Sequence, residues 1–226
     1  MLFSATLRKR SQARSGLTRQ ADTVPRPSVP LIEPIATGLL PRTQVATARG
    51  WLPVGRLRPG DMVLTFDHGT QPLRDLVPAA PETACSPANE RAVLVPTGAL
   101  ENRSPMVLLP GQAVLLESDN AEEMFGDPFA LLPAAALIGL RGITAVDMPD
   151  EAGFCPHFDR DQILYAQGAT LLFCPEYPAV GAADPAPAPL AIRDARNLVE
   201  RLIEEEAAAD APQERGISGA DGGQAS

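Results

Sequence analysis

Three side chains late in the chain are of the types that bind zinc: Cys155, His157 and Cys174. Thiolates and imidazoles are the usual ligands of structural zinc sites, which need a fourth donor. The Cys-Pro-His spacing does not match a recognised zinc-finger pattern, so the alternative interpretation is that the thiols are buried or lie at a strand edge. We expect no metal and no other cofactor, and keep these three residues as the only metal candidates.

The other familiar catalytic motifs are missing from the sequence. It contains no Gly-rich phosphate loop, no Gly-x-Ser-x-Gly elbow and no helix with paired histidines. His68 falls in an Asp-His-Gly turn, and we expect it to be exposed. Trp51 is the sole tryptophan. We expect it to anchor the core beside the first hairpin, with an exposed stacking platform as the alternative.

The elements that would position these side chains are short strands. The segment from Gly38 to Gln71 predicts a compact β meander, because three β-prone runs are separated by Gly-containing turns. The three runs cover residues 44–47, 51–54 and 62–67. Gly50, Gly60 and Gly69 supply the positive φ that tight turns require.

Apolar runs of strand length continue through the middle of the chain, each bounded by turn residues. They cover residues 92–95, 106–109, 113–116, 162–166 and 170–174. Residues 119–123 predict a capped helical turn, and residues 133–140 a second short helix with proline at its first position. The pattern predicts an all-β fold with one or two short helices.

A longer helix is predicted near the C-terminus. After an Ala/Pro linker at 179–189, apolar residues recur at helical spacing over residues 190–209. One interpretation is that this stripe packs on the β domain, because an isolated helix of this length is marginal in water. The other is that it binds a protein partner or a second copy. Residues 210–226 are polar and Gly-rich, and we expect them to be disordered.

The order of the strand motifs carries a family resemblance. Residues 38–47 read GLLPRTQVAT and residues 60–65 read GDMVLT; MVLLPGQAVLL follows at 106–116 and FDRDQILYAQG at 158–168. Together these blocks resemble a bacterial Hint domain, the Hedgehog/intein fold. The resemblance spans residues 36–178 and implies a Hint-like compact β domain.

That resemblance also implies a chemistry, autoprocessing or protein splicing. In the family, a first-position Cys, Ser or Thr attacks the preceding carbonyl, and a Thr-x-x-His or Ser-x-x-His pair polarises the bond and moves the proton. Here the equivalent positions hold Gly38, Leu109 and Gln112, and Asp161 stands at a late histidine position. Cys155 stands near another habitual histidine. Gly38, Leu109 and Gln112 have no side chain that can attack a carbonyl or transfer a proton near neutral pH.

Three functions follow from these residues. The first is a Hint domain with a degenerate active site that acts as a binding or regulatory module, and we expect no catalytic residues in it. The second is residual self-processing at the junction Ala36–Gly38, with Thr37 attacking the Ala36 carbonyl as the rescue candidate. The third is a metal-assisted hydrolase that uses the cysteine and histidine candidates.

Composition restricts the partners. The net charge of −9 argues against nucleic-acid binding, and no apolar run reaches the length of a membrane span. Residues 1–35 combine a basic segment with a Pro-rich linker and predict a disordered arm. Because that arm lacks a continuous apolar core, we expect a cytoplasmic protein or one exported without a conventional signal peptide. The sequence favours no oligomeric state.

Overall fold

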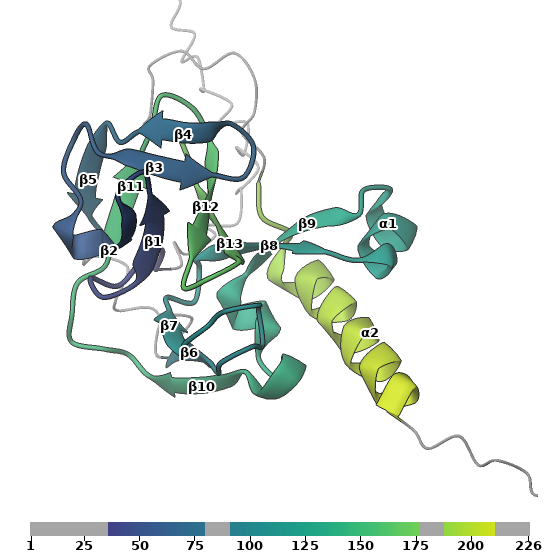
Figure 1. Ribbon diagram of the computed structural model, residues 1–226. Helices are drawn as coiled ribbons and strands as arrows, with labels where there is room; N and C mark the ends of the chain where they lie inside the picture. Colours follow the sequence, from purple (N-terminus) through teal and green to yellow (C-terminus); the bar gives the residue numbers. More distant parts are fainter. Residues whose placement is uncertain (1–35, 80–90, 177–187, 211–226) are drawn as a thin grey trace, which may run out of the picture. The chain divides into compact units, whose positions relative to one another are not determined.

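The computed structural model describes residues 36–79, 91–176 and 188–210, and these form a mostly β structure with two α-helices (Figure 1). The predictions made for residues 1–35, for the Ala/Pro linker up to residue 187 and for the tail from residue 211 lie outside the described residues. The all-β Hint-like prediction is confirmed, including the C-terminal helix.

An eight-stranded antiparallel sheet forms the centre of the fold. Its strands run in the order β2-β1-β3-β12-β13-β8-β9, with β4 paired to β3 and a further pairing between β1 and β12. The strands are β1 (Gln44–Thr47), β2 (Gly50–Pro53), β3 (Met62–Thr65), β4 (Gly69–Pro72), β8 (Ala113–Glu117), β9 (Phe129–Pro133), β12 (Gln162–Ala166) and β13 (Thr170–Cys174). The sheet thus joins the start of the domain to its end through β3 and β12.

Two small antiparallel sheets complete the β structure. One has the order β10-β6-β7 and the other pairs β11 with β5. Their strands are β5 (Asp75–Pro78), β6 (Arg91–Val95), β7 (Met106–Leu108), β10 (Thr144–Asp147) and β11 (Phe154–His157). Strand β11 is important for the site, because its first residue also pairs with the segment that enters β1.

The predicted turns form with the expected backbone. Gly50, Gly60 and Gly69 have φ values of 99°, 91° and 66°, a region that glycine enters without steric cost. In the turn before β3, the Asp61 carboxylate accepts a hydrogen bond of 2.9 Å from the Arg58 N–H. These turns fix the register of the first hairpins.

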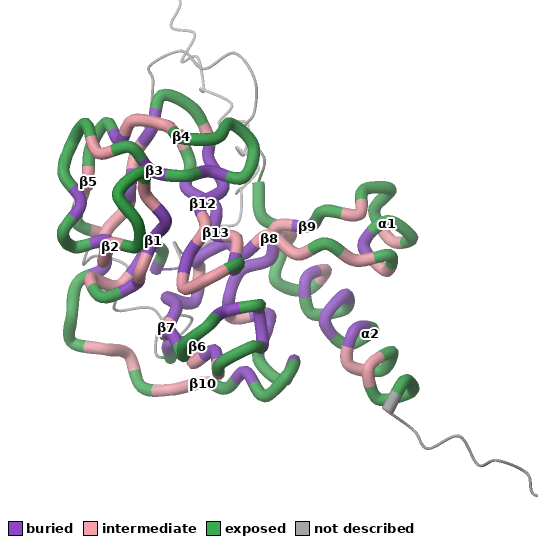
Figure 2. Tube along the Cα trace, viewed as in Figure 1, coloured by how far each residue is buried: buried purple, intermediate pink, exposed green. Residues whose placement is uncertain are grey.

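Apolar side chains lie on both faces of the large sheet. The main core contains fully buried residues from most strands, including Val45, Val63 and Leu172, together with part of the C-terminal helix (Figure 2). A second cluster forms around Ile163 and Phe173. Because side chains alternate along a strand, Ile163 and Leu164 point to opposite faces, and each face has its own apolar cluster.

Two helices lie against the sheet. Helix α1 (Asp119–Phe125) begins where Ser118 Oγ accepts from the Asn120 N–H at 3.1 Å and ends at Gly126 with φ 82°. Helix α2 (Ile192–Asp210) contacts α1, β9 and the 3-10 turns at Ala134–Leu137 and Leu140–Gly142. Among the described residues, no helix is long and apolar enough to cross a membrane.

The structure corrects two predictions. Trp51 is 42% exposed instead of buried, because β2 is an edge strand and its pairing with Ala46 places the indole on the opposite face from Val45. The second predicted helix is only a 3-10 turn, and Pro133 ends strand β9 instead of opening a helix. The N–H groups of Ala134 and Ala135 bind the carbonyls of Gln112 and Pro110, which fixes this connection locally.

Candidate functional site

The segment that enters β1 is held on two sides. The Leu39 N–H and carbonyl exchange two 2.8 Å hydrogen bonds with Phe154 at the start of β11. On the other side, the Gly111 N–H donates to the Ala36 carbonyl at 2.8 Å. The peptide bond between Thr37 and Gly38 is therefore fixed between β11 and the turn that connects β7 with β8.

Gln112 binds this peptide bond from that turn. Its Oε1 accepts a hydrogen bond from the Gly38 N–H at 3.3 Å. Its Nε2 donates to the carbonyls of Phe173 at 2.9 Å and Ala113 at 3.1 Å, which determines which end of the amide faces Gly38. The side chain is only 4% exposed, so these bonds lie out of solvent. An amide in this position orients the peptide but does not exchange a proton with it near neutral pH.

Gly38 is the residue that the sequence resemblance aligns with the family's nucleophile, and its backbone conformation is unusual. Its φ of +121° lies in a region that L-residues with a side chain rarely adopt. A Cβ built on it would lie 3.0 Å from the Phe154 carbonyl oxygen and 3.4 Å from Cys155 Sγ. Both the backbone and the surrounding atoms thus fit a glycine at this position.

A thiol lies beside the carbonyl of the same peptide bond. Cys155 Sγ is 4.0 Å from the Thr37 carbonyl oxygen and donates to it. The thiol is half-buried, and burial raises its pKa. Cys174 is fully buried, and burial together with the neighbouring Cys155 raises the pKa of its thiol. Both raised pKa values favour the protonated thiols at neutral pH.

The other predicted positions have different surroundings. Leu109 is buried, and its backbone carbonyl accepts from the Gln112 N–H at 2.9 Å. The Thr37 side chain is exposed. Asp161 Oδ1 accepts from the Glu176 N–H at 2.7 Å, which ties the start of β12 to the residues after β13. The structure therefore brings together Gly38, Gln112 and Cys155, while Asp161 stabilises a backbone connection.

The three metal candidates lie on strands β11 and β13. His157 and Cys155 lie two residues apart on β11, and Cys174 is the last residue of β13. Within the part of the chain that the structure describes, no three His, Cys, Asp or Glu side chains form a group that could hold a metal ion. His68 is exposed, as predicted, and its Nδ1 lies 3.2 Å from Gln162 Oε1.

Two features of the site were not predicted from the sequence. The contact between Cys155 and the Thr37 carbonyl depends on the pairing of Leu39 with Phe154. No local sequence motif predicts that pairing. The Gln112 amide is oriented by the backbone carbonyl of Phe173, which any residue type at position 173 would supply. The residue type at position 173 therefore does not predict this contact. The sequence singled out Cys155 as a metal candidate and as a residue near a habitual family histidine, but not as a partner of the Thr37 carbonyl.

The short strands of this mostly β chain form an intein-like fold. A comparison with protein families matches the Hint domain to residues 37–171, which is more than half of the chain. The chain therefore belongs to the Hint domain family. No match is found among curated proteins.

Solved inteins are also similar to this chain. The gp41-1 intein crystal structure shows 15% identity and a TM-score of 0.36, covering 60% of this chain and 96% of the intein. The MchDnaB-1 intein shows 13% identity and a TM-score of 0.35, covering 59% of this chain and 98% of the intein. At these values the likeness carries no argument about activity.

Proposed function

We propose that this Hint domain binds its N-terminal junction without processing it, and acts as a binding or regulatory module. The observation that supports this proposal is the hydrogen bond from the Gly38 N–H to Gln112 Oε1. It keeps the junction peptide in place with a group that neither attacks nor transfers a proton. Position 38 itself offers no attacking atom.

Each step of the family reaction lacks a reagent in this arrangement. Peptide cleavage needs a nucleophile at the carbonyl carbon and a proton for the departing nitrogen. Gln112 accepts the Gly38 proton in a hydrogen bond instead of delivering one to the nitrogen. Leu109 presents no hydroxyl to assist it. The junction is therefore expected to be stable.

Intact mass spectrometry of the purified full-length chain tests this proposal. The chain is kept for several days at neutral pH, with and without hydroxylamine or an added thiol. We expect one unchanged mass in all samples. A product that begins at Thr37 or Gly38, and that accumulates with time, would contradict the proposal.

Residual self-processing is the second candidate, and the position of Cys155 favours it. The thiol donates to the Thr37 carbonyl oxygen, so a small movement would bring Sγ to the carbonyl carbon. In the reaction, the Cys155 thiolate adds to that carbon, the bond to the Gly38 nitrogen breaks, and this nitrogen takes a proton to become a free amine. Water then hydrolyses the thioester, releasing residues 1–37 as a carboxylic acid and restoring the thiol.

The two nucleophile candidates are distinguished by the same mass measurement on variants. If Cys155 reacts, the fragment begins at Gly38, forms faster at alkaline pH because the pKa of the thiol is raised, and disappears in Cys155→Ala. If Thr37 attacks the Ala36 carbonyl, the fragment begins at Thr37 and disappears in Thr37→Ala. Cys174→Ala is the matched control, since among the described residues the thiol hydrogen bond to the Thr37 carbonyl comes from Cys155 and not from this buried thiol.

A further inference from the structure

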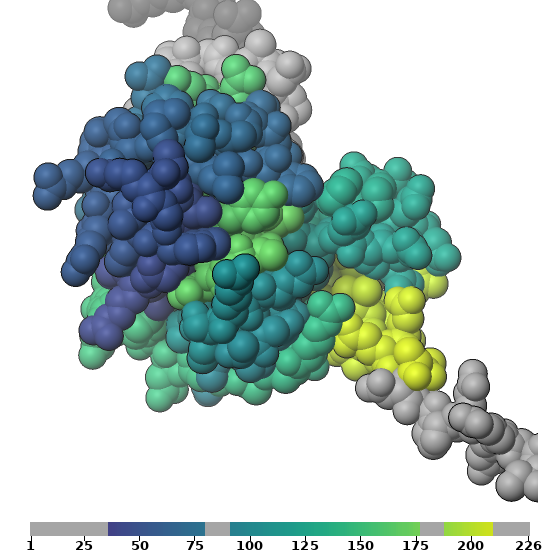
Figure 3. Space-filling model, viewed as in Figure 1, coloured from purple at the N-terminus to yellow at the C-terminus, as the bar shows by residue number. Residues whose placement is uncertain are grey.

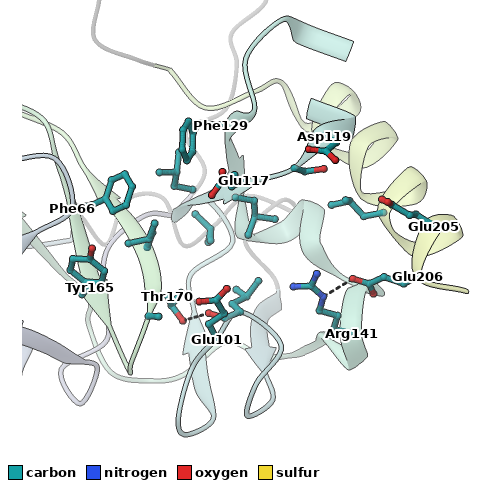
Figure 4. Close-up of a pocket in the computed structure, with 18 of the residues that line it drawn as sticks. Phe66, Glu101, Glu117, Asp119, Phe129, Arg141, Tyr165, Thr170, Glu205 and Glu206 are labelled. Carbon is teal, nitrogen blue, oxygen red and sulfur yellow. Dashed lines mark hydrogen bonds and ion pairs between the residues drawn. The ribbon is translucent and has the colours of Figure 1, made fainter. Parts of the chain in front are cut away.

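A wide groove of about 760 Å³ lies away from the junction, between the large sheet and helix α2 (Figure 4). Its sides come from β8, β9, the β12–β13 hairpin and the last turns of α2. Figure 3 shows this face, hollowed between the hairpin in green and the lobe of α1 and β9 in teal. Its size is sufficient for several side chains of a bound peptide.

Two exposed phenylalanine rings and the half-buried ring of Tyr165 line one side of the groove. Phe66, Phe129 and Tyr165 come from three separate parts of the chain and lie next to one another (Figure 4). The Phe66 ring centre is 6.2 Å from that of Phe129 and 6.3 Å from that of Tyr165. Phe66 is 43% exposed and Phe129 is 41% exposed, so the rings present apolar surface to solvent. Such a row is a common feature of binding surfaces.

Carboxylates line the rest of the groove. Five acidic side chains and a single guanidinium give the lining a formal charge of −4; they are Glu101, Glu117, Asp119, Glu205, Glu206 and Arg141. Arg141 pairs with Glu206 at 2.6 Å, and the Asn120 amide donates to Glu205. Among the described residues, none forms an ion pair with Glu101, Glu117 or Asp119. These three carboxylates remain available to a cationic ligand.

We propose that this groove binds an arginine-rich peptide segment. Guanidinium groups stack on aromatic rings and pair with carboxylates through two hydrogen bonds, whereas an ammonium does neither as well. Phe129 and Glu117 are direct partners in the β8–β9 register, so a ring and a carboxylate stand side by side. This proposal rests on the proposed function as a binding module, and it names the surface that binds and the chemical class of the partner.

The chain itself supplies a suitable probe sequence. Residues 1–20 contain four arginines, one lysine and no acid. A fluorescently labelled peptide of this sequence is titrated into a full-length variant that carries Arg8→Gln, Lys9→Gln, Arg10→Gln, Arg14→Gln and Arg19→Gln. In that variant the chain's own basic residues do not compete with the probe. Binding is followed by fluorescence anisotropy.

We expect saturable binding that weakens as salt is added, because the groove acts partly through charge. A peptide with lysine in place of each arginine should bind at least about fivefold more weakly. Further replacement of Glu101→Gln and Glu117→Gln in the protein should weaken binding about tenfold, and Phe66→Ala should do the same. The control is Asp147→Asn on β10, which removes an exposed carboxylate outside the groove and should have no effect.

Three results would overturn the proposal: no binding, equal binding of the arginine and lysine peptides, or an equal effect of Asp147→Asn and the groove variants. Thermal unfolding of each variant shows whether a loss of binding reflects a loss of folding. Intact mass measured on the same samples reports the junction separately. A cleaved junction contradicts the proposed function, whereas an intact junction without peptide binding contradicts only the groove proposal.

Discussion

The conformation of Gly38 restricts which residues the first position of this domain accepts. A φ of +121° is unfavourable for any side chain, and the Phe154 carbonyl oxygen lies 3.0 Å from the place of a Cβ. Gln112 then binds the N–H of the same residue. The junction is therefore determined by three local features: a backbone angle, a close carbonyl and an amide acceptor.

Gly38→Ala should lower the free energy of unfolding by about 1–3 kcal/mol, through backbone strain and the close contact with Phe154. Gly50→Ala is a matched control, because Gly50 also has a positive φ but has no atom near its missing Cβ. Urea denaturation of both variants measures the difference. Equal destabilisation would show that the close contact adds nothing.

The buried thiol of Cys174 should make the protein less stable at alkaline pH. Its pKa is raised in the folded state, so above the ordinary value of 9.0 the unfolded chain loses this proton first. The folded state then binds more protons than the unfolded state, and stability falls by about 1.4 kcal/mol per pH unit until the folded pKa is reached. Below pH 9 this contribution is constant.

Cys174→Ala removes that titration, and its stability curve should be flatter above pH 9 than that of the wild type. Denaturant midpoints measured from pH 7 to pH 10.5 provide the comparison. Parallel curves for the two proteins would contradict the attribution of the alkaline loss of stability to the Cys174 thiol. Cys155→Ala should have a smaller effect, because that thiol is only partly buried.

Much of the site could be predicted from residue types, but its contacts could not. The resemblance to the Hint family singled out Gly38, Gln112 and Leu109. The contact between Cys155 and the Thr37 carbonyl joins residues far apart in the sequence. It exists because β11 pairs with the segment before β1, and such long-range pairing leaves no periodic signal in either strand.

At the scale of elements, the sequence predicted those strands that consist of an apolar run bounded by a Gly-containing turn. The runs at residues 44–47, 162–166 and 170–174 match β1, β12 and β13. Strands β5 and β10 were missed because both ends of each are exposed, and β4 and β11 because neither has a continuous apolar run. Strand β9 was missed because its last residue, Pro133, was taken to open a helix. Helix α2 was predictable because its apolar residues recur at helical spacing over five turns.

The buried stripe of α2 should contribute strongly to stability. Leu198 is fully buried where the helix packs on the domain, so Leu198→Ala should cost about 2–5 kcal/mol. Ile192 on the same helix is 38% exposed, and Ile192→Ala should change stability by no more than about 0.5 kcal/mol. Urea denaturation of both variants tests the packing, and similar small effects would contradict it.

At the scale of the described domain, helix α2 covers apolar surface that the sheet leaves open. It contacts the 3-10 turns that contain Leu137 and Leu140, both fully buried. Together with β9 and α1 it also forms the groove wall that carries Glu205 and Glu206. Helix α2 therefore contributes both to the stability of the domain and to the negative charge of the proposed binding groove.

A chain that ends at residue 187 should therefore unfold at a lower temperature and bind more of a fluorescent apolar dye than the full chain. Both effects follow from exposure of the surface around Leu137 and Leu140. Differential scanning fluorimetry and dye titration measure them. An unchanged unfolding temperature without added dye binding would show that α2 covers little of the core.

The pairing of Leu39 with Phe154 has a consequence for any cysteine that is introduced at position 38. The two residues exchange both hydrogen bonds, so positions 38 and 155 face each other at the next, closely spaced site of an antiparallel bridge. The Cβ of a cysteine introduced at position 38 would lie about 3.4 Å from Sγ of the native Cys155. Oxidation would then join the two as a cross-strand disulfide. The new thiol would then be held in a disulfide, and any assay of its reactivity would need Cys155 replaced or the protein kept under reductant.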